Sequence, residues 1–243
     1  ERGITIFSKQ AMLFAGDKEF TLLDTPGHVD FSAEMERTLS VLDYAVLVIS
    51  GSDGVQSHTR TLWRLLTRYE VPTFLFINKM DLAGADKDAL LRQLTATLSA
   101  ECVDFSASQE TRDEALALCD EAALEQLLER GKIDDALISE MVKNRKVFPC
   151  FFGSALKLDG VEAFLTALAC FTREPVYPKE FGAKIFKISR DAQGARLTWL
   201  KVTGGALRVK APLTYRAQNQ DYNEKADQLR LYSGVKFRAL EEA

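Results

Sequence analysis

The sequence has no long hydrophobic run and no secretory leader. A helix that spans a membrane needs about 20 consecutive apolar residues, and a leader needs a basic head followed by an apolar stretch. The chain begins Glu-Arg-Gly-Ile-Thr and contains neither pattern. We therefore expect a cytoplasmic protein with no membrane partner.

Cysteine is scarce as well, and its four copies do not cluster. Cys102, Cys119, Cys150 and Cys170 are far apart, and no CxxC pair occurs. Disulfide scaffolds and zinc sites need cysteines at closer, paired spacings. We therefore expect four reduced core residues and neither a disulfide set nor a metal site built on cysteine.

Neither sign of charge dominates the whole chain, whose formal net charge is −4, but its two parts differ. Residues 181–243 carry 12 Lys and Arg against 6 Asp and Glu, whereas residues 1–180 carry 19 against 29. A basic region joined to an acidic one is typical of a nucleic-acid surface. It is equally typical of a surface that only aids solubility, so charge alone leaves both readings open.

Apolar strands alternate with amphipathic helices through the first two-thirds of the chain. Three apolar runs are short and continuous, as expected for strands buried on both faces of a parallel sheet. We expect strands at 44–50, 73–78 and 147–153 and a hairpin over 11–24. We expect helices near 32–42, 57–69, 86–100 and 160–171, and Asp86 and Asp159 are the expected helix-start residues of the last two. This alternation indicates an open α/β sheet.

Two segments depart from that alternation. Residues 109–146 hold two helical patterns, 112–129 and 134–146, which Gly131 separates, so we expect a helical insertion. The proline-containing segment 173–180 is typical of a linker. Beyond it the pattern has period two, with strands expected at 184–189, 196–202, 207–209 and 228–232, as in a β-barrel or sandwich.

The motif Asp24-Thr-Pro-Gly-His28 ends an expected strand and precedes a helix. Ligands of open α/β sheets bind at the carboxyl ends of such strands. Asp24 there can hold the water shell of Mg²⁺, the amide of Gly27 can approach a phosphate because glycine has no Cβ, and His28 can orient a water. The alternative is a tight turn with a helix-capping aspartate.

The motif Asn78-Lys-Met-Asp81 lies at the end of the apolar strand expected at 73–78. The carboxylate of Asp81 can accept both the N1–H and the 2-amino group of guanine, which adenine does not offer. Asn78 can bond loop backbone and the base edge, and the stem of Lys79 can lie along the ring. Taken alone, the motif also fits an ordinary polar loop.

A third loop, Gly153-Ser-Ala-Leu156, follows the last of these strands. The backbone N–H groups beside Ser154, those of Ala155 and Leu156, can donate to guanine O6, although a plain strand-to-helix turn would have the same sequence character. The order of the three loops is what discriminates. Five fixed residues recur by chance on the order of once in a million start positions, so the first motif followed by the second leaves little room for coincidence.

With these motifs in this order, the chain resembles the translational GTPases of the elongation factor G type. Arg2-Gly-Ile-Thr-Ile6 is similar to that family's first switch loop, and residues 24–28 to its second. The resemblance implies that Thr5 and Asp24 serve Mg²⁺, that Ile4 forms part of an apolar gate beside the attacking water, and that His28 acts in catalysis with Gly27 at the phosphate. Histidine at that position marks the translational branch.

The resemblance also implies the fold. It is an α/β, P-loop-NTPase-like G domain over 1–172, a mostly parallel sheet with helices on both faces, with a helical insertion at about 109–146. The linker 173–180 and an incomplete antiparallel β-barrel over 181–243 follow. No G-x-x-x-x-G-K-[ST] motif occurs, so we expect the first strand and the phosphate loop upstream of Glu1, and these 243 residues to be inactive alone.

The function implied is ribosome-dependent hydrolysis of GTP to GDP by a protein that is monomeric off the ribosome. Its contact with ribosomal RNA is expected on the small-subunit side, through 181–243. Segments 54–63 and 72–81, and Leu82 where elongation factor G tends to carry arginine, are similar to tetracycline-resistance ribosomal protection proteins. The alternatives are an elongation factor G or release factor type of GTPase, or a truncated ribosome-binding fragment without hydrolysis.

Overall fold

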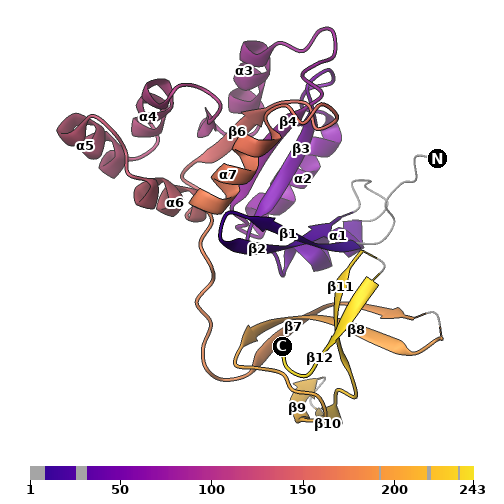
Figure 1. The fold of residues 1–243 in the computed structure, drawn as a ribbon. Helices are drawn as coiled ribbons and strands as arrows, with labels where there is room; N and C mark the ends of the chain where they lie inside the picture. Colours follow the sequence, from indigo (N-terminus) through magenta and orange to yellow (C-terminus); the bar gives the residue numbers. More distant parts are fainter. Residues whose placement is uncertain (1–8, 26–31, 192, 218–219, 235) are drawn as a thin grey trace. The chain divides into compact units, whose positions relative to one another are not determined.

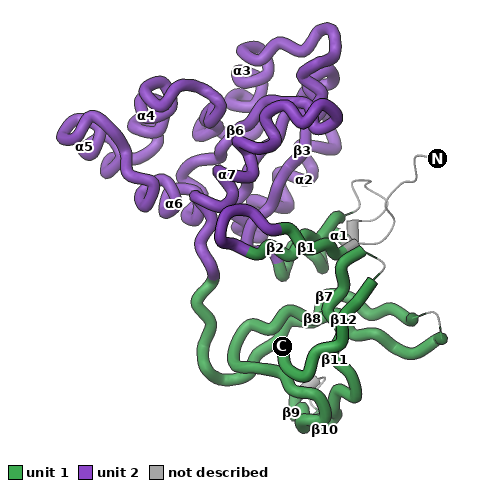
Figure 2. The backbone as a smooth tube through the Cα atoms, in the orientation of Figure 1, with its two compact units in different colours: residues 1–13, 19–41, 175–243 green, residues 14–18, 42–174 purple. Residues whose placement is uncertain are grey.

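The computed structural model describes residues 9–25, 32–191, 193–217, 220–234 and 236–243. The chain divides into two compact units, coloured separately in Figure 2. We call residues 14–18 and 42–174 the sheet unit, and residues 1–13, 19–41 and 175–243 the strand unit.

The sheet unit is built on four parallel strands in the order β3-β4-β6-β5. These strands are β3 (Ala45–Ser50), β4 (Thr73–Asn78), β5 (Cys102–Asp104) and β6 (Phe148–Phe152). The three apolar runs form the parallel strands that the sequence predicts, and β4 is buried along its length until Asn78. Burial on both faces is wrong for β3, because Val46 and Val48 are exposed on one of its faces. The sequence did not predict β5, because three residues are too few to establish a pattern.

Helices cover both faces of this sheet, as predicted. The helices of the unit are α2 (Ser57–Arg68), α3 (Lys87–Thr97), α4 (Gln109–Ala117), α5 (Glu121–Arg130), α6 (Asp135–Lys143) and α7 (Val161–Phe171). Successive side chains of a strand point to opposite faces. Phe148 of β6 packs on Trp63 of α2, with ring centroids 4.7 Å apart, whereas Phe151 packs on Phe164 of α7 at 5.4 Å. The sheet therefore lies between α2 and α7 (Figure 1).

The helical insertion contains three helices where the sequence pattern predicts two. The expected helix 112–129 is interrupted because Asp120 accepts hydrogen bonds from the amides of Ala122 and Ala123 and so begins a new helix, α5. Gly131 ends α5 with a φ of 71°, a left-handed conformation that glycine adopts without strain. The predicted break at this glycine is confirmed.

Of the two predicted helix starts, one is confirmed and one is wrong. Asp86 caps α3 by accepting from the amide of Ala89 at 3.1 Å. Asp159 does not cap α7, because Gly160 precedes that helix with a φ of 71°. Asp159 instead exchanges two backbone hydrogen bonds with Ser154, each 3.0 Å long.

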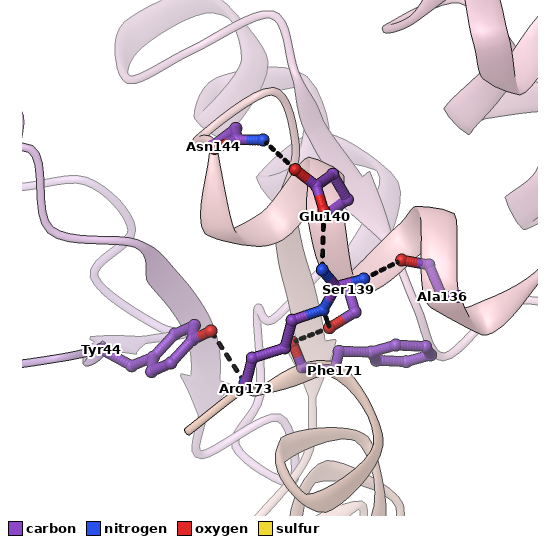
Figure 3. A network of polar contacts seen from close by, with 7 residues as sticks. All are labelled: Tyr44, Ala136, Ser139, Glu140, Asn144, Phe171 and Arg173. Atoms are coloured by element: carbon purple, nitrogen blue, oxygen red, sulfur yellow. Dashed lines mark hydrogen bonds and ion pairs between the residues drawn. The ribbon is translucent and has the colours of Figure 1, made fainter. Parts of the chain in front are cut away.

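A polar network fixes the point at which the chain leaves α7 (Figure 3). The guanidinium of Arg173 donates to three groups of α6: the hydroxyl of Ser139, the carboxylate of Glu140 and the carbonyl of Ala136. The backbone amide of Arg173 donates to the hydroxyl of Tyr44 at 2.9 Å. The last helix of the insertion thus holds the end of the sheet unit in place.

The described residues of the strand unit form one helix and antiparallel strands in two-stranded ladders. They are α1 (Ser32–Leu39), β1 (Lys9–Ala15), β2 (Lys18–Asp24), β7 (Gly182–Arg190), β8 (Arg196–Gly204), β9 (Pro212–Ala217), β10 (Gln220–Lys225), β11 (Leu229–Ser233) and β12 (Lys236–Leu240). The predicted hairpin over 11–24 is confirmed by β1 and β2, which run into residues 14–18 of the sheet unit at their turn. The predicted strand 207–209 is wrong, since only Arg208 there forms a bridge, to Glu242.

The four cysteines are free thiols, as predicted, but not all lie in the core. Cys102 and Cys150 are buried, Cys119 is half-buried and Cys170 is exposed. Burial and nearby acidic groups raise the pKa of Cys119 to about 11. Among the residues described here, each helix is too short or too polar to cross a bilayer.

Candidate guanine-nucleotide site

Two of the predicted loops meet at one edge of the parallel sheet. Strands β4 and β6 are hydrogen-bonded neighbours, with Ile77 opposite Phe152. Because both run in the same direction, the loops that follow them, 78–81 and 153–156, leave the sheet side by side at its carboxyl edge. We call these two loops together the base-side loops.

The side chain of Asn78 ties the base-side loops together. Its carboxamide oxygen accepts hydrogen bonds from the backbone amide of Lys79 at 2.8 Å and from that of Ala155, 77 residues further on, at 2.9 Å. The amide of Met80 donates to the carbonyl of Gly153 at 3.0 Å. Two hydrogen bonds, from the amides of Ala155 and Met80, therefore join the two loops, and the third orders the first loop internally.

Two backbone positions at this edge are conformationally restricted. Lys79 has a φ of 65°, a left-handed conformation that is uncommon for a residue with a side chain. A Cβ added at Gly153 would collide with the carbonyl oxygen of Asp159. The loop after β6 therefore requires glycine at its first position, and the tight turn brings Ser154 back against Asp159.

Asp81 presents the acceptor group of the site. Its side chain is 19% exposed, and the hydroxyl of buried Ser154 and the ammonium of Lys157 lie against it. Both neighbours lower the pKa of the carboxyl, Ser154 more strongly, although the serine hydroxyl does not complete a hydrogen bond to any of the described residues. The carboxylate is therefore ionised at neutral pH and ready to accept from two N–H donors.

The donors of the third loop are not equivalent. The amide of Ala155 is engaged with the carboxamide of Asn78. The amide of Leu156 donates to none of the described residues, and the residue is 91% exposed. Of the two amides predicted to face guanine O6, Leu156 is thus the one that remains available in this arrangement, and Ala155 supports the loop.

The residues predicted for phosphate, metal and catalysis are described only in part. Asp24 is the last residue of β2 and is exposed. Thr5, Ile4, Gly27 and His28 lie outside the described residues. Within the described ranges, no group of three or more His, Cys, Asp and Glu side chains is arranged to hold a metal ion.

The sequence reasoning missed Lys157 as a member of the site. Its ammonium lies 3.4 Å from the Asp81 carboxylate. The only signal in the sequence is that a lysine follows Ser-Ala-Leu directly, and a lysine in a turn is ordinarily solvated. The contact depends on the way the base-side loops pack together.

A parallel sheet covered by helices, with polar loops paired at its carboxyl edge, is the architecture of a nucleotide-binding domain. Comparison with protein families makes this specific. The chain belongs to the family of elongation factor Tu GTP-binding domains, whose description matches residues 1–174.

Two further similarities extend beyond that region. The chain is 34% identical over 242 residues to an oxytetracycline resistance protein from Streptomyces rimosus, an alignment that covers 88% of this chain and 36% of the relative. A crystal structure from Thermus thermophilus superposes with a TM-score of 0.82 at 23% identity and covers 99% of this chain and 43% of the other. The chain thus spans less than half the length of either protein, and the second similarity supports the fold alone.

Proposed function

We propose that the base-side loops bind guanine and that the protein is a ribosome-dependent GTPase of the ribosomal protection type. The observation that carries the proposal is the carboxamide of Asn78, which joins the two loops beside the ionised Asp81. An acceptor pair held rigidly at a sheet edge, with an amide donor nearby, is complementary to guanine and not to adenine.

Each group of the base-side loops has a role in this proposal. The two oxygens of Asp81 accept from N1–H and the 2-amino group of guanine. The amide of Leu156 donates to O6, and the stem of Lys79 covers one face of the ring. The carboxamide of Asn78 accepts from the amide of Ala155. This hydrogen bond keeps the base-contacting groups in place, which lowers the entropy lost on binding.

Hydrolysis is assigned to the two switch loops on the strength of the sequence motifs. His28 orients the attacking water in line with the γ-phosphate, while Ile4 keeps bulk water from it. The amide of Gly27 approaches the phosphate, and Thr5 and Asp24 would hold Mg²⁺. The ion, when bound, offsets negative charge on the phosphates.

We further propose a G domain over 1–172 with its helical insertion at about 109–146, a linker over 173–180 and a β-barrel domain from 181. The likeness to an oxytetracycline resistance protein supports the protection type over a translocating or terminating one. The protein would act in the cytoplasm, as a monomer when off the ribosome.

Ribosome-stimulated turnover is the direct test. The full-length protein should hydrolyse GTP slowly alone and much faster with ribosomes, and it should reduce the amount of tetracycline bound to ribosomes. Stimulated hydrolysis without drug release would favour the elongation or release factor type. Absence of stimulation would overturn the proposal.

The basic part of the strand unit is proposed to contact ribosomal RNA on the small-subunit side. Several of its cations have partners within the unit: for example, Lys201 donates to the carbonyl of Val41, and Arg208 pairs with Glu242 at 2.7 Å. Lys184 and Lys210 are exposed and are better probes.

Replacing Lys184 and Lys210 together by glutamine should weaken ribosome binding and make its salt dependence shallower. The slope of log K against log salt should fall by roughly 0.7–0.9 for each phosphate that the variant no longer neutralises. Sedimentation with ribosomes across a salt series measures this. The charge-matched control replaces the exposed Lys132 and Lys143 of the sheet unit by glutamine. Equal effects in both variants would show that the charge acts only through solubility.

A further inference from the structure

Lys157 pairs with the carboxylate of Asp81, which the proposed function assigns to the guanine base. Its Nζ atom lies 3.4 Å from Oδ2 of Asp81. The lysine side chain is 62% exposed, whereas that of the aspartate is only 19% exposed. The accessible edge of this carboxylate is thus shared with a neighbouring cation before any ligand arrives.

The turn that carries Lys157 is closed on itself and holds the lysine near Asp81. Ser154 and Asp159 are joined by two backbone hydrogen bonds, and the amide of Lys157 donates to the carbonyl of Ser154 at 3.1 Å. Leu158 next to it has a φ of 59°, which reverses the chain at this point. The backbone of Lys157 is therefore fixed, while its long side chain can swing out to solvent.

We propose that Lys157 is an internal competitor that competes with guanine for the carboxylate of Asp81. Its ammonium pairs with Asp81 while the site holds no base, and it withdraws when a base binds. The inference rests on the proposed function, because it assigns Asp81 to guanine. Lys157 then lowers nucleotide affinity and makes no contact that favours nucleotide binding.

Charge explains why the competition is real and why it is limited. The carboxylate stays ionised, since Ser154 and then Lys157 lower its pKa. A full positive charge satisfies it better than one neutral N–H donor does, but guanine offers two donors in parallel. Because the lysine is mostly exposed, its pairing is screened by solvent and is easily broken. The base therefore wins, with a modest loss of affinity.

The same reasoning restricts the effect to ligands that use Asp81. Guanine and hypoxanthine nucleotides must both displace the ammonium, so both lose affinity. A ligand that makes no bond to this carboxylate does not displace Lys157 and loses nothing. The effect also requires the negative charge, so it should vanish where residue 81 carries a neutral amide.

The test measures GDP affinity of the full-length protein by calorimetry at low and high salt. Lys157→Met keeps the stem and removes the charge, and it should tighten GDP binding by roughly two- to fivefold at low salt. The gain should shrink at high salt, where the pair is screened in the original protein. Lys157→Arg keeps the cation and should resemble the original protein. Lys132→Met, an exposed lysine away from the site, serves as the charge control.

A second measurement separates this inference from the proposed function. In an Asp81→Asn background, probed with xanthosine diphosphate, Lys157→Met should have no effect. GDP binding that is unchanged or weakened by Lys157→Met, in a protein that still prefers guanine, would overturn the competitor and leave the guanine site intact. An original protein without guanine preference would overturn both.

Discussion

Asp81→Asn in the full-length protein is expected to exchange guanine preference for xanthine preference. The amide can donate to the 2-oxo group of xanthine, where the carboxylate can only accept. GTP affinity should fall roughly 10²- to 10⁴-fold, because a polar site rejects a mismatched edge strongly, while the amide oxygen still accepts one bond. Competition of GTP, XTP and ATP for the site measures the exchange.

Asp88→Asn is the matched control for this substitution. It also removes one carboxylate, on the exposed side of the first turn of α3. Nucleotide preference should be unaltered in that variant. GTP preference that survives Asp81→Asn would refute the assignment of the base-side loops, and an equal loss in the two variants would attribute the effect to net charge.

His28→Ala is expected to leave GTP binding nearly intact and to slow ribosome-stimulated turnover roughly 10²- to 10⁴-fold. This is the usual range for the loss of a group that handles a proton or orients a water. The imidazole acts on the water and not on the nucleotide, so binding should change little. Single-turnover hydrolysis on ribosomes, together with nucleotide titration, separates the two quantities.

The only other histidine of the chain, His58, supplies the control. It lies near the start of α2 and is half-buried, and we assign it no part in the reaction. His58→Ala should therefore keep ribosome-stimulated turnover within a few-fold. If His28→Ala lost binding and turnover in equal measure, His28 would have a structural role and the catalytic assignment would be wrong.

The sheet could be predicted from the sequence because its central strands, β4 and β6, are buried on both faces. Such strands are continuously apolar, and β4 carries that pattern up to Asn78, where the polar loop begins. The elements that were missed have weak or competing patterns. Strand β5 has three residues, and the helix expected over 112–129 has a good apolar period, yet Asp120 divides it through a cap that periodicity does not reveal.

Loop identity was likewise accessible from the sequence, since motif order links each loop to the end of a strand. The division of labour within the loops was not. Ala155 and Leu156 are equivalent donors as far as the sequence shows, and the structure distinguishes them because only the amide of Ala155 reaches Asn78. That contact depends on the register between β4 and β6, which places Ile77 opposite Phe152.

By itself, the sequence determined the α/β class, the strands that carry the loops and the residue types available for guanine, because burial and motif spacing are properties of the chain in order. The tertiary structure decided which of those groups are engaged with one another. It joined Asn78 to Ala155 and brought Lys157 onto Asp81, 76 positions away in the chain. Such contacts follow from the side-by-side packing of two strands, and no local pattern encodes the distance between their ends.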